Sequence, residues 1–173
     1  MINQGPRKPT MDQMLLGMAF VAAFRSTCRR AFVGAVAARE GRVKSIGYAG
    51  SPPGDPECLD VGCDMGPAGG CVRTIHAEAN TIAWAAREGS SLRDATMYIT
   101  ISPCIVCARL ILQAGVKRIV YHCEYRDTSG IDFLRAHGLQ VDHLPDLGPY
   151  QMLADELAKR IEAWKAINAE EEG

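Results

Sequence analysis

The sequence His76-Ala77-Glu78 and, with its first cysteine 26 residues after Glu78, the sequence Pro103-Cys104-Ile105-Val106-Cys107 decide the fold of this chain. The two cysteines are three residues apart, which places both thiols on the same side of the first turn of a helix. We predict that this helix has Ser102 as its N-cap and Pro103 in its first turn. The positive end of the helix lowers cysteine pKa values and favours the thiolates that zinc requires.

These motifs contain the side chains of a catalytic zinc site. His76, Cys104 and Cys107 supply three protein ligands, so a tetrahedral Zn²⁺ keeps its fourth position for water. Glu78 follows the histidine by two residues, and at the opening turn of a helix both side chains can reach toward the metal. We therefore expect Glu78 to take the proton of the water and to pass it to a ring nitrogen and a departing amine.

Each signal is weaker when it is taken alone. A lone Cys-x-x-Cys is equally typical of a zinc ribbon or a redox motif, and a lone histidine is more often a core residue than a ligand. Coincidental core residues and a purely structural zinc site are therefore the alternatives. A structural site has no use for Glu78 and offers no fourth ligand. The combination of two motifs at helix starts, with a strand between them, favours an active site.

The composition indicates a globular protein of one domain. The chain has 173 residues, of which 47% are hydrophobic and 23% charged, and this disfavours a disordered or fibrous protein. Nineteen basic against twenty acidic residues leave a net charge of −1, so we expect no binding of long nucleic acid by charge alone. No run reaches the ~18 consecutive apolar residues of a membrane span, so no membrane association is expected.

An apolar run over residues 14–24 is similar to the core of a secretory signal, but its flanks favour a buried first helix. Asp12 lies at its entrance, Arg25, Arg29 and Arg30 follow directly, and no small-x-small cleavage site is present. The seven cysteines are an odd number, and two of them form the Pro-Cys-x-x-Cys unit. Metal ligands and reduced thiols are therefore expected in place of a disulfide framework, which predicts a cytoplasmic protein.

Helical and strand patterns alternate along the chain. We predict helices over residues 11–28, 75–87, 104–114, 129–136 and 151–169, and strands over 32–38, 43–48, 96–100, 116–121 and 139–141. Residues 50–70 are predicted as a long Gly/Pro-rich loop that is functional or pinned. The order predicts an α/β fold with a partly parallel sheet. We divide the chain into a polar N-terminal arm (1–10), a zinc-binding domain (11–145), and a linker and helix (146–173) that packs on the domain or on a neighbouring subunit.

The chain resembles the cytidine and deoxycytidylate (dCMP) deaminase superfamily, most of all its dCMP branch, which has the zinc signature of nucleobase deaminases. The resemblance runs over residues 11–141 and is carried, besides Pro103 to Cys107, by Arg25-Ser26-Thr27-Cys28-x-Arg30, Val33-Gly34-Ala35-Val36, Gly47-Tyr48-Ala49-Gly50-Ser51-Pro52, Cys71-Val72-Arg73-Thr74-Ile75-His76-Ala77-Glu78 and Tyr125-Arg126-Asp127. It implies a three-layer α/β/α fold with a five-stranded mixed sheet, and a homo-oligomer such as a hexamer. It also implies a hydrolase that converts dCMP to dUMP and ammonia, with a zinc-bound hydroxide as nucleophile and Glu78 as proton shuttle.

The resemblance also implies which residues bind the substrate. It places the phosphate contacts on Arg30, Tyr125 and Arg126, and an arginine fork suits a phosphate because it donates two parallel hydrogen bonds. Ala77 and the backbone at Thr100-Ile101-Ser102 would hold the cytosine ring and its leaving amino group. From the residues alone, Arg29-Arg30 is more typical of a solvated helix end, and Tyr125 of a half-buried aromatic.

Ala49 departs from the family, which has Asn in the Gly-Tyr-Asn-Gly turn, where the side chain contacts the sugar or the pyrimidine. Alanine cannot make this hydrogen bond, and losing one costs about 1–3 kcal/mol. Two explanations stay open: another group supplies the contact, or the substrate is a modified dCMP with a bulkier base or an altered sugar. Many members of the branch are activated by dCTP and inhibited by dTTP, with Mg²⁺, through the same turn. These nucleotides are candidate effectors here, although Ala49 argues against carrying the regulation over.

Further cysteines indicate a second metal site. Cys28 ends the predicted first helix, and Cys58, Cys63 and Cys71 lie in or beside the long loop. Some family members hold such a loop with an additional zinc, and four thiolates would form a closed structural site that pins it. Free thiols in a reduced protein are the alternative, because the family's usual histidine before Cys58 is Glu57 here.

Three other functions stay open. A deaminase of nucleosides, free bases or other aminated heterocycles would need no phosphate contacts. A deaminase that edits nucleic acid would need a basic track for the phosphate backbone, and the net charge of −1 gives no sign of one. A zinc-stabilised binding module without catalysis would tolerate Glu78→Gln, whereas the enzyme would lose several orders of magnitude in turnover.

Overall fold

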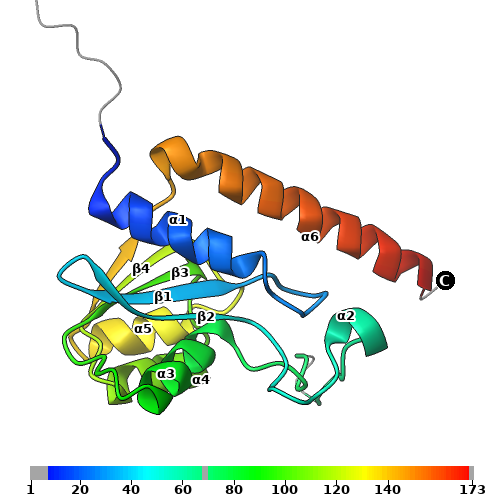
Figure 1. Ribbon diagram of the computed structural model, residues 1–173, viewed down its shortest axis with the longest axis horizontal. Coiled ribbons are helices and arrows are strands. Elements are labelled where there is room, and N and C mark those ends of the chain that lie inside the picture. Colours follow the sequence, from blue (N-terminus) through cyan, green and yellow to red (C-terminus); the bar gives the residue numbers. More distant parts are fainter. Residues whose placement is uncertain (1–7, 68–69, 172–173) are drawn as a thin grey trace, which may run out of the picture.

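The computed structural model describes residues 8–67 and 70–171, and these form a sheet covered by helices on both faces (Figure 1). The elements in chain order are α1 (Met11–Ala23), β1 (Gly34–Arg39), β2 (Arg42–Tyr48), α2 (Cys58–Val61), α3 (Ala77–Arg87), β3 (Thr96–Ile101), α4 (Ile105–Gln113), β4 (Arg118–Cys123), α5 (Ser129–Ala136), β5 (Gln140–His143), a 3-10 turn (Gly148–Tyr150) and α6 (Gln151–Glu171). Within these residues the sheet has five strands in the order β2-β1-β3-β4-β5. Strand β1 is antiparallel to β2 and β3, whereas β3, β4 and β5 are parallel.

Successive side chains of the strands point to opposite faces of the sheet, and this alternation builds two cores. On β1, Val36 and Ala38 belong to the core under α1 and α6, whereas Ala35 and Ala37 belong to the core under α3, α4 and α5. Figure 1 shows α1 and α6 on one face and α3, α4 and α5 on the opposite face. For the part of the chain that the structure describes, the predicted three-layer α/β/α fold with a five-stranded mixed sheet is confirmed.

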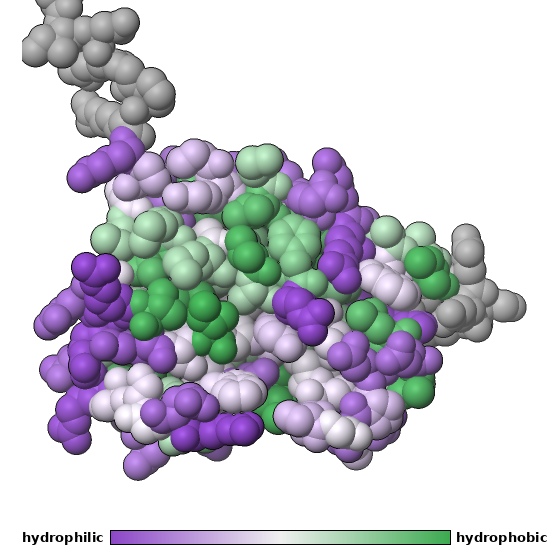
Figure 2. All heavy atoms as spheres, in the orientation of Figure 1, coloured by the Kyte–Doolittle hydropathy of each residue, from purple (hydrophilic) through white to green (hydrophobic). Residues whose placement is uncertain are grey.

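The outer surface of the α1 layer is partly apolar. Figure 2 shows apolar side chains gathered over α1 and the neighbouring part of the sheet, beside strongly hydrophilic ones. Val21 on α1 and Val43 and Ile46 on the edge strand β2 are among the exposed large apolar residues. No helix within residues 8–67 and 70–171 has both the length and the apolar character needed to cross a membrane.

The first helix is shorter than predicted, because it ends at Ala23 and not at Cys28. Two of the residues between them bond to Ala49, which directly follows the end of β2. The Ser26 hydroxyl donates to the backbone oxygen of Ala49 at 2.8 Å, and the Thr27 N–H donates to the same oxygen at 3.0 Å. These tertiary hydrogen bonds replace the ones that further helical turns would make.

Two other predictions of secondary structure differ from the structure. Helix α3 begins at Ala77 and not at Ile75, because Ile75 and Gly50 exchange two backbone hydrogen bonds as an isolated β-bridge. The loop predicted over 50–70 contains a short helix, α2 (Cys58–Val61). The strands differ from their predicted ranges by no more than two residues at either end. Residues 1–7 of the predicted polar arm lie outside the described residues.

The C-terminal helix α6 packs on α1 and on the core of its own chain. Leu157 is 3% exposed, and the partly buried Ile161 and Trp164 lie against the same core. Arg160 donates a hydrogen bond to the backbone oxygen of Phe24 at 3.0 Å. Leu147, in the segment before the helix, is fully buried. Of the two surfaces that the sequence offers for this helix, the structure shows packing on the domain.

An ion-pair network joins α1 to the parallel strands. The Arg118 guanidinium donates two hydrogen bonds to the Asp12 carboxylate, at 2.9 and 2.8 Å, and a third to Asp142 at 2.7 Å. The Tyr98 hydroxyl donates to Asp12 at 2.8 Å. The hydrogen bonds from Arg118 hold the pKa of Asp12 below its ordinary value, against the effect of burial. Because the pairing is bidentate and half-buried, it stabilises the fold more than an ordinary surface ion pair does.

We expect Asp12→Asn to lower the free energy of unfolding by about 1–3 kcal/mol at neutral pH, because an amide cannot accept both charged hydrogen bonds. Since the folded-state pKa of Asp12 is depressed, its contribution is complete above the ordinary value of 3.8 and is lost as the pH falls through the folded-state value. The stability difference between wild type and variant, measured by urea unfolding, should therefore shrink below pH 3.8.

Asp94→Asn is the matched control, because it removes an exposed ion pair with Lys117 and should change stability little. Equal losses in the two variants would contradict the special role of the Asp12 network.

Candidate active site

The side chains of the two sequence motifs meet where α3 and α4 begin. His76 is the N-cap residue of α3 and Cys104 that of α4, and both have extended backbones, with φ −64° and ψ 151° and with φ −70° and ψ 167°. Among the described residues, no side-chain hydrogen bond caps either helix start. Positions that usually carry Ser, Thr, Asp or Asn for capping therefore carry side chains that contact each other across the two helices.

Helix α4 begins later than the sequence predicts. Ser102 was expected as its N-cap, and the structure places Cys104 there. Ser102 bonds instead to the segment of β4: its N–H donates to the Cys123 oxygen at 2.8 Å, and its hydroxyl accepts from the Tyr125 N–H at 2.8 Å. Cys107 lies in the first turn of the helix that follows, so both thiols stay at its start.

The separations within this cluster fit a zinc ion. Nδ1 of His76 lies 3.6 Å from Sγ of Cys104 and 3.5 Å from Sγ of Cys107. The three ligand atoms lie within 4.8 Å of one another. Tetrahedral bonds of about 2.3 Å to sulfur and 2.0–2.1 Å to nitrogen place a nitrogen and a sulfur about 3.6 Å apart. The set therefore fits zinc and leaves one of the four positions for a further ligand.

The electrostatics of the cluster favour a thiolate. The hydrogen bond from Cys107, with that from His76, lowers the pKa of Cys104 to about 3. The same hydrogen bond to Cys104, together with burial, raises the pKa of Cys107. The pKa of His76 is raised, chiefly by its hydrogen bond to Cys104. At neutral pH Cys104 is therefore the charged ligand, and a bound cation would favour loss of the remaining thiol proton.

Glu78 is the buried acid of the site. It lies in the first turn of α3 and is 4% exposed. It lines the same cavity as His76 and Cys104. Burial raises the pKa of Glu78 above its ordinary value of 4.5. A carboxyl group with a raised pKa can hold a proton and release it again, which is the property that general acid–base catalysis needs.

The cavity lies at the carboxyl ends of the parallel strands β3 and β4, the edge at which α/β sheets bind ligands. Its volume is about 260 Å³. Its lining, among the described residues, consists of Cys28, Arg30, Ala31, Val33, Ala49, Cys71, Thr74, His76, Ala77, Glu78, Ile101, Ser102, Cys104, Tyr125 and Arg126. The cavity thus brings together every substrate-binding residue implied by the resemblance except Thr100.

Thr100 points away from this cavity. It is 1% exposed and lines a neighbouring hollow with Phe20 and Phe32. Its hydroxyl accepts a hydrogen bond from the Gly34 N–H at 3.2 Å. The strand alternation explains the difference, because Thr100 is two residues after Tyr98 and shares its orientation toward the α1 layer.

Sequence reasoning missed the residue that lets α5 support the start of α4. A Cβ atom on Gly130 would lie 2.1 Å from the backbone oxygen of Pro103 and 2.8 Å from the carbonyl carbon of Cys104. Any larger residue would therefore displace the segment that carries the thiols. A glycine inside a predicted helix, with no turn to require it, is the signal that could have revealed this contact.

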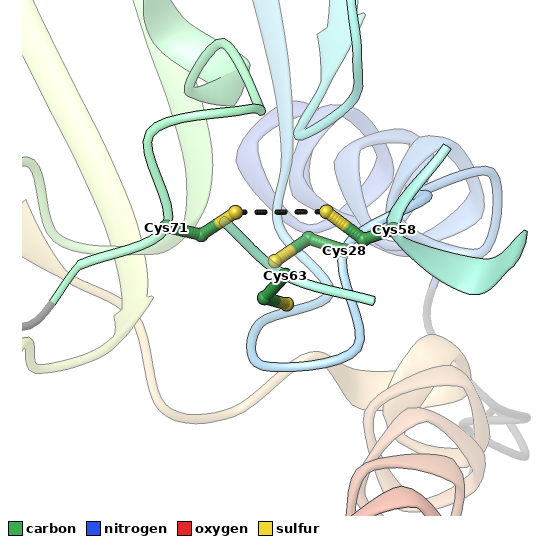
Figure 3. Close-up of side chains that lie close together, drawn as sticks. All are labelled: Cys28, Cys58, Cys63 and Cys71. Carbon is green, nitrogen blue, oxygen red and sulfur yellow. Dashed lines mark hydrogen bonds between the residues drawn. The ribbon is translucent and has the colours of Figure 1, made fainter. Parts of the chain in front are cut away.

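Cys28, Cys58, Cys63 and Cys71 form a second cluster of cysteines (Figure 3). The Sγ atoms of Cys28, Cys58, Cys63 and Cys71 lie within 4.8 Å of one another, and those of Cys58 and Cys71 are 3.5 Å apart. Zinc bonds of about 2.3 Å place tetrahedral thiolates about 3.8 Å apart, so the cluster fits a closed zinc site. Cys28 and Cys71 also line the cavity, so the cluster forms part of the cavity wall.

The thiols of this cluster differ in their pKa values. Burial raises the pKa of Cys58, and it raises that of Cys63 to about 11. Burial acts in the same direction on Cys71, but hydrogen bonds, first that from the backbone of Arg73, outweigh it and lower the pKa of Cys71 to about 7. The cluster therefore contains one cysteine that loses its proton readily, Cys71, and two that do not, Cys58 and Cys63.

Comparison with known proteins identifies the family. The model for the cytidine and deoxycytidylate deaminase zinc-binding region matches residues 9–123. The chain belongs to the cytidine and deoxycytidylate deaminase family. It is a zinc-dependent deaminase and a hydrolase, as the sequence predicts, and both motifs lie within the matched range.

This deaminase is similar to named relatives over most of its length. It is 34% identical over 171 residues to the deoxycytidylate deaminase of Enterobacteria phage T4, which covers 76% of this chain and 88% of that protein. It is 38% identical over 124 residues to the deoxycytidylate deaminase of Mycobacterium phage D29, which covers 66% and 95%. The crystal structure of dCMP deaminase from the cyanophage S-TIM5 in complex with dCMP and dUMP aligns with a TM-score of 0.71 and 32% identity, over 80% of this chain and 99% of that one.

Proposed function

We propose that this deaminase converts dCMP to dUMP and ammonia by hydrolysis. The observation that carries the proposal is one cavity that is lined by the zinc ligands His76 and Cys104, by the buried Glu78, and by Arg30 and Arg126. The similar proteins named above are deoxycytidylate deaminases, and one of them was crystallised with dCMP and dUMP. A nucleoside or a free base has no phosphate for the two arginines to bind.

The chemistry is divided between a metal and a carboxyl group. A zinc ion held by His76, Cys104 and Cys107 would act as a Lewis acid that lowers the pKa of a water molecule. Glu78 accepts one proton from this water and donates it to the ring nitrogen as the water oxygen bonds to the ring carbon. It then moves the second proton, from the new hydroxyl group, to the amine, which leaves as ammonia when its bond to the carbon breaks. Burial suits Glu78 to this role, because the raised pKa keeps the proton on the carboxyl group between the two transfers.

Other cavity residues bind and orient the nucleotide in this proposal. Arg30 and Arg126 bind the phosphate as charged forks, with Tyr125 beside them. The Arg126 guanidinium lies 5.7 Å from the centre of the Tyr125 ring, and the Tyr125 N–H donates to Ser102. The phosphate side of the cavity is therefore connected to the segment before α4. Ala77 and Ser102 contact the cytosine ring and its amino group.

Glu78→Gln keeps the side-chain size and removes the titrating group. We expect kcat for dCMP, measured as ammonia release, to fall by about 10²–10⁴-fold. The zinc content should not change, because Glu78 is not a ligand in this proposal. Glu88→Gln, at the exposed end of α3, is the matched control and should keep the wild-type kcat. Unchanged turnover in Glu78→Gln would contradict the proposal and favour a zinc-stabilised binding module.

One observation favours a second candidate function, the deamination of a modified dCMP. Ala49 is 6% exposed and lines the cavity. Its backbone is occupied, because its N–H donates to the Val33 oxygen at 2.9 Å and its oxygen accepts from the Ser26 hydroxyl. The side chain is a methyl group at a position where the family has Asn. The smaller group leaves room for a bulkier base or an altered sugar.

Ala49→Asn tests whether this position sets specificity. If the natural substrate carries a substituent on the cytosine ring, the variant should lose about tenfold in kcat/KM for a 5-substituted dCMP relative to dCMP. Ala83→Asn, on the exposed face of α3, is the control. An unchanged ratio of the two kcat/KM values would exclude a role of Ala49 in specificity.

We also propose that Cys28, Cys58, Cys63 and Cys71 hold a second, structural zinc. Four thiolates fill all four positions, so this metal would take no part in the reaction. It would join the loop over 50–71 to the segment after α1, and the close approach of the four Sγ atoms supports this. Such a site would explain how a loop of this length keeps its place in the cavity wall.

Metal analysis of protein purified without chelators tests the second site. We expect about two zinc ions per chain in the wild type and about one in Cys63→Ser. Cys63 is the suitable choice, because it does not line the cavity in the described structure and, unlike Cys58, it is not buried. Cys123→Ser, which changes an exposed cysteine, should keep the wild-type content. One zinc per chain in the wild type would exclude the second site and favour free thiols.

Assembly, regulation and location stay predictions. The resemblance implies a homo-oligomer, with a hexamer as the expected form, and a small nucleotide as the binding partner. The resemblance also implies dCTP and dTTP, with Mg²⁺, as candidate effectors. The reduced cysteines predict a cytoplasmic protein.

A further inference from the structure

Consecutive residues after α1 have three different roles in the structure. Cys28 belongs to the second thiol cluster, Arg29 contacts α6, and Arg30 lines the substrate cavity. Residues 26–33 belong to no helix or strand. Because no backbone ladder fixes this segment, the contacts of the neighbours of Arg30 contribute to its position.

Arg29 is held from two sides. Its guanidinium carbon lies 4.9 Å from the centre of the Trp164 ring, within the ~6 Å range of a cation–π interaction. Its Nη2 donates a hydrogen bond to the backbone oxygen of Leu59 at 2.9 Å. Leu59 follows Cys58 in α2, so Arg29 connects α6 to the loop of the second thiol cluster.

Helix α6 also contacts residues near both ends of this segment. Arg160, four residues before Trp164, donates to the backbone oxygen of Phe24 at 3.0 Å. Its guanidinium carbon also lies 4.7 Å from the centre of the Phe32 ring. Arg160 therefore contacts Phe24, just before the segment, and Phe32, near its end, and Trp164 contacts Arg29 between them.

No role for α6 follows from the family match. The matched region ends at residue 123, and α6 spans Gln151–Glu171. The contact between Trp164 and Arg29 thus connects a part of this chain outside the family region with the residue next to Arg30.

We propose that Trp164 is a positioning residue for the substrate phosphate. By holding Arg29, it fixes the backbone that presents Arg30 to the cavity. The proposal rests on the proposed function, because it takes the phosphate of a nucleoside monophosphate as the ligand of Arg30. Arg29 is not among the described residues that line the cavity, so its effect reaches the phosphate through Arg30. A pre-positioned arginine binds more tightly, since less conformational freedom is lost on binding.

Trp164→Leu keeps an apolar side chain against the core and removes the aromatic face. We expect this variant to raise KM for dCMP by about two- to ten-fold, with little change in kcat. Trp164→Phe keeps a ring for Arg29 and should restore most of the KM. In an Arg30→Ala background, Trp164→Leu should have no further effect, because the two residues act on the same contact.

The chain offers a matched control in its second tryptophan. The Trp84 ring centre lies 4.7 Å from the guanidinium carbon of Arg87, and Trp84 is 40% exposed on α3. Trp84→Leu removes a comparable contact away from the cavity and should leave KM unchanged. An unchanged KM in Trp164→Leu would overturn the proposal. A rise in KM that persists in the Arg30→Ala background, or that Trp84→Leu shares, would overturn it as well.

Calorimetric binding of dUMP separates this proposal from the proposed function. If the wild type does not deaminate dCMP, the proposed function fails, and dUMP binding decides the positioning role. Weaker dUMP binding by Trp164→Leu than by the wild type then supports the role, and equal binding overturns it. If the wild type deaminates dCMP and Trp164→Leu matches it in KM and dUMP affinity, only the positioning role fails. A wild type that neither deaminates dCMP nor binds dUMP overturns both.

Discussion

The site depends on the close approach of His76 to the two thiols at the start of α4. Its Nδ1 lies 3.6 Å from Sγ of Cys104 and 3.5 Å from Sγ of Cys107. These distances require α3 and α4 to begin next to each other at one edge of the sheet. The bridge between Ile75 and Gly50 sets where α3 begins, and the contact of Gly130 with Pro103 lets α5 approach the start of α4. Because the ligand set exists only in the folded chain, metal binding and folding stabilise each other.

The two sides of the substrate cavity come from segments that belong to different layers of the fold. Its catalytic side comes from the starts of α3 and α4, on the sheet face of the larger core. Its other side includes Arg30 of the segment 26–33 and Cys71 of the segment that follows β2, and neither residue belongs to a helix or strand. The second thiol cluster joins these two segments, and Arg29 joins both to α6. The geometry of the cavity therefore depends on contacts that lie outside it.

Much of the fold follows from the sequence, because the spacing of apolar residues predicts the alternating elements and the motifs carry the ligand types. The start of α4 differs from its capping prediction and α3 begins two residues later than predicted, since Ser102 and Ile75 make tertiary hydrogen bonds that no local pattern reveals. The strand alternation turns the Thr100 side chain toward the α1 layer, whereas the resemblance implies a substrate contact with the backbone of residues 100–102, which stays a prediction. The contact between Arg29 and Trp164 joins distant parts of the chain, so residue spacing could not predict it.

We propose that a zinc-dependent proton-transfer site and a phosphate-binding site occupy one cavity. This proposal is tested most directly by measuring ammonia release from dCMP and from deoxycytidine with the zinc-loaded wild-type protein. We expect turnover of dCMP and little or none of deoxycytidine, because only dCMP has a phosphate for Arg30 and Arg126. Turnover of deoxycytidine alone, or of neither compound, would contradict it.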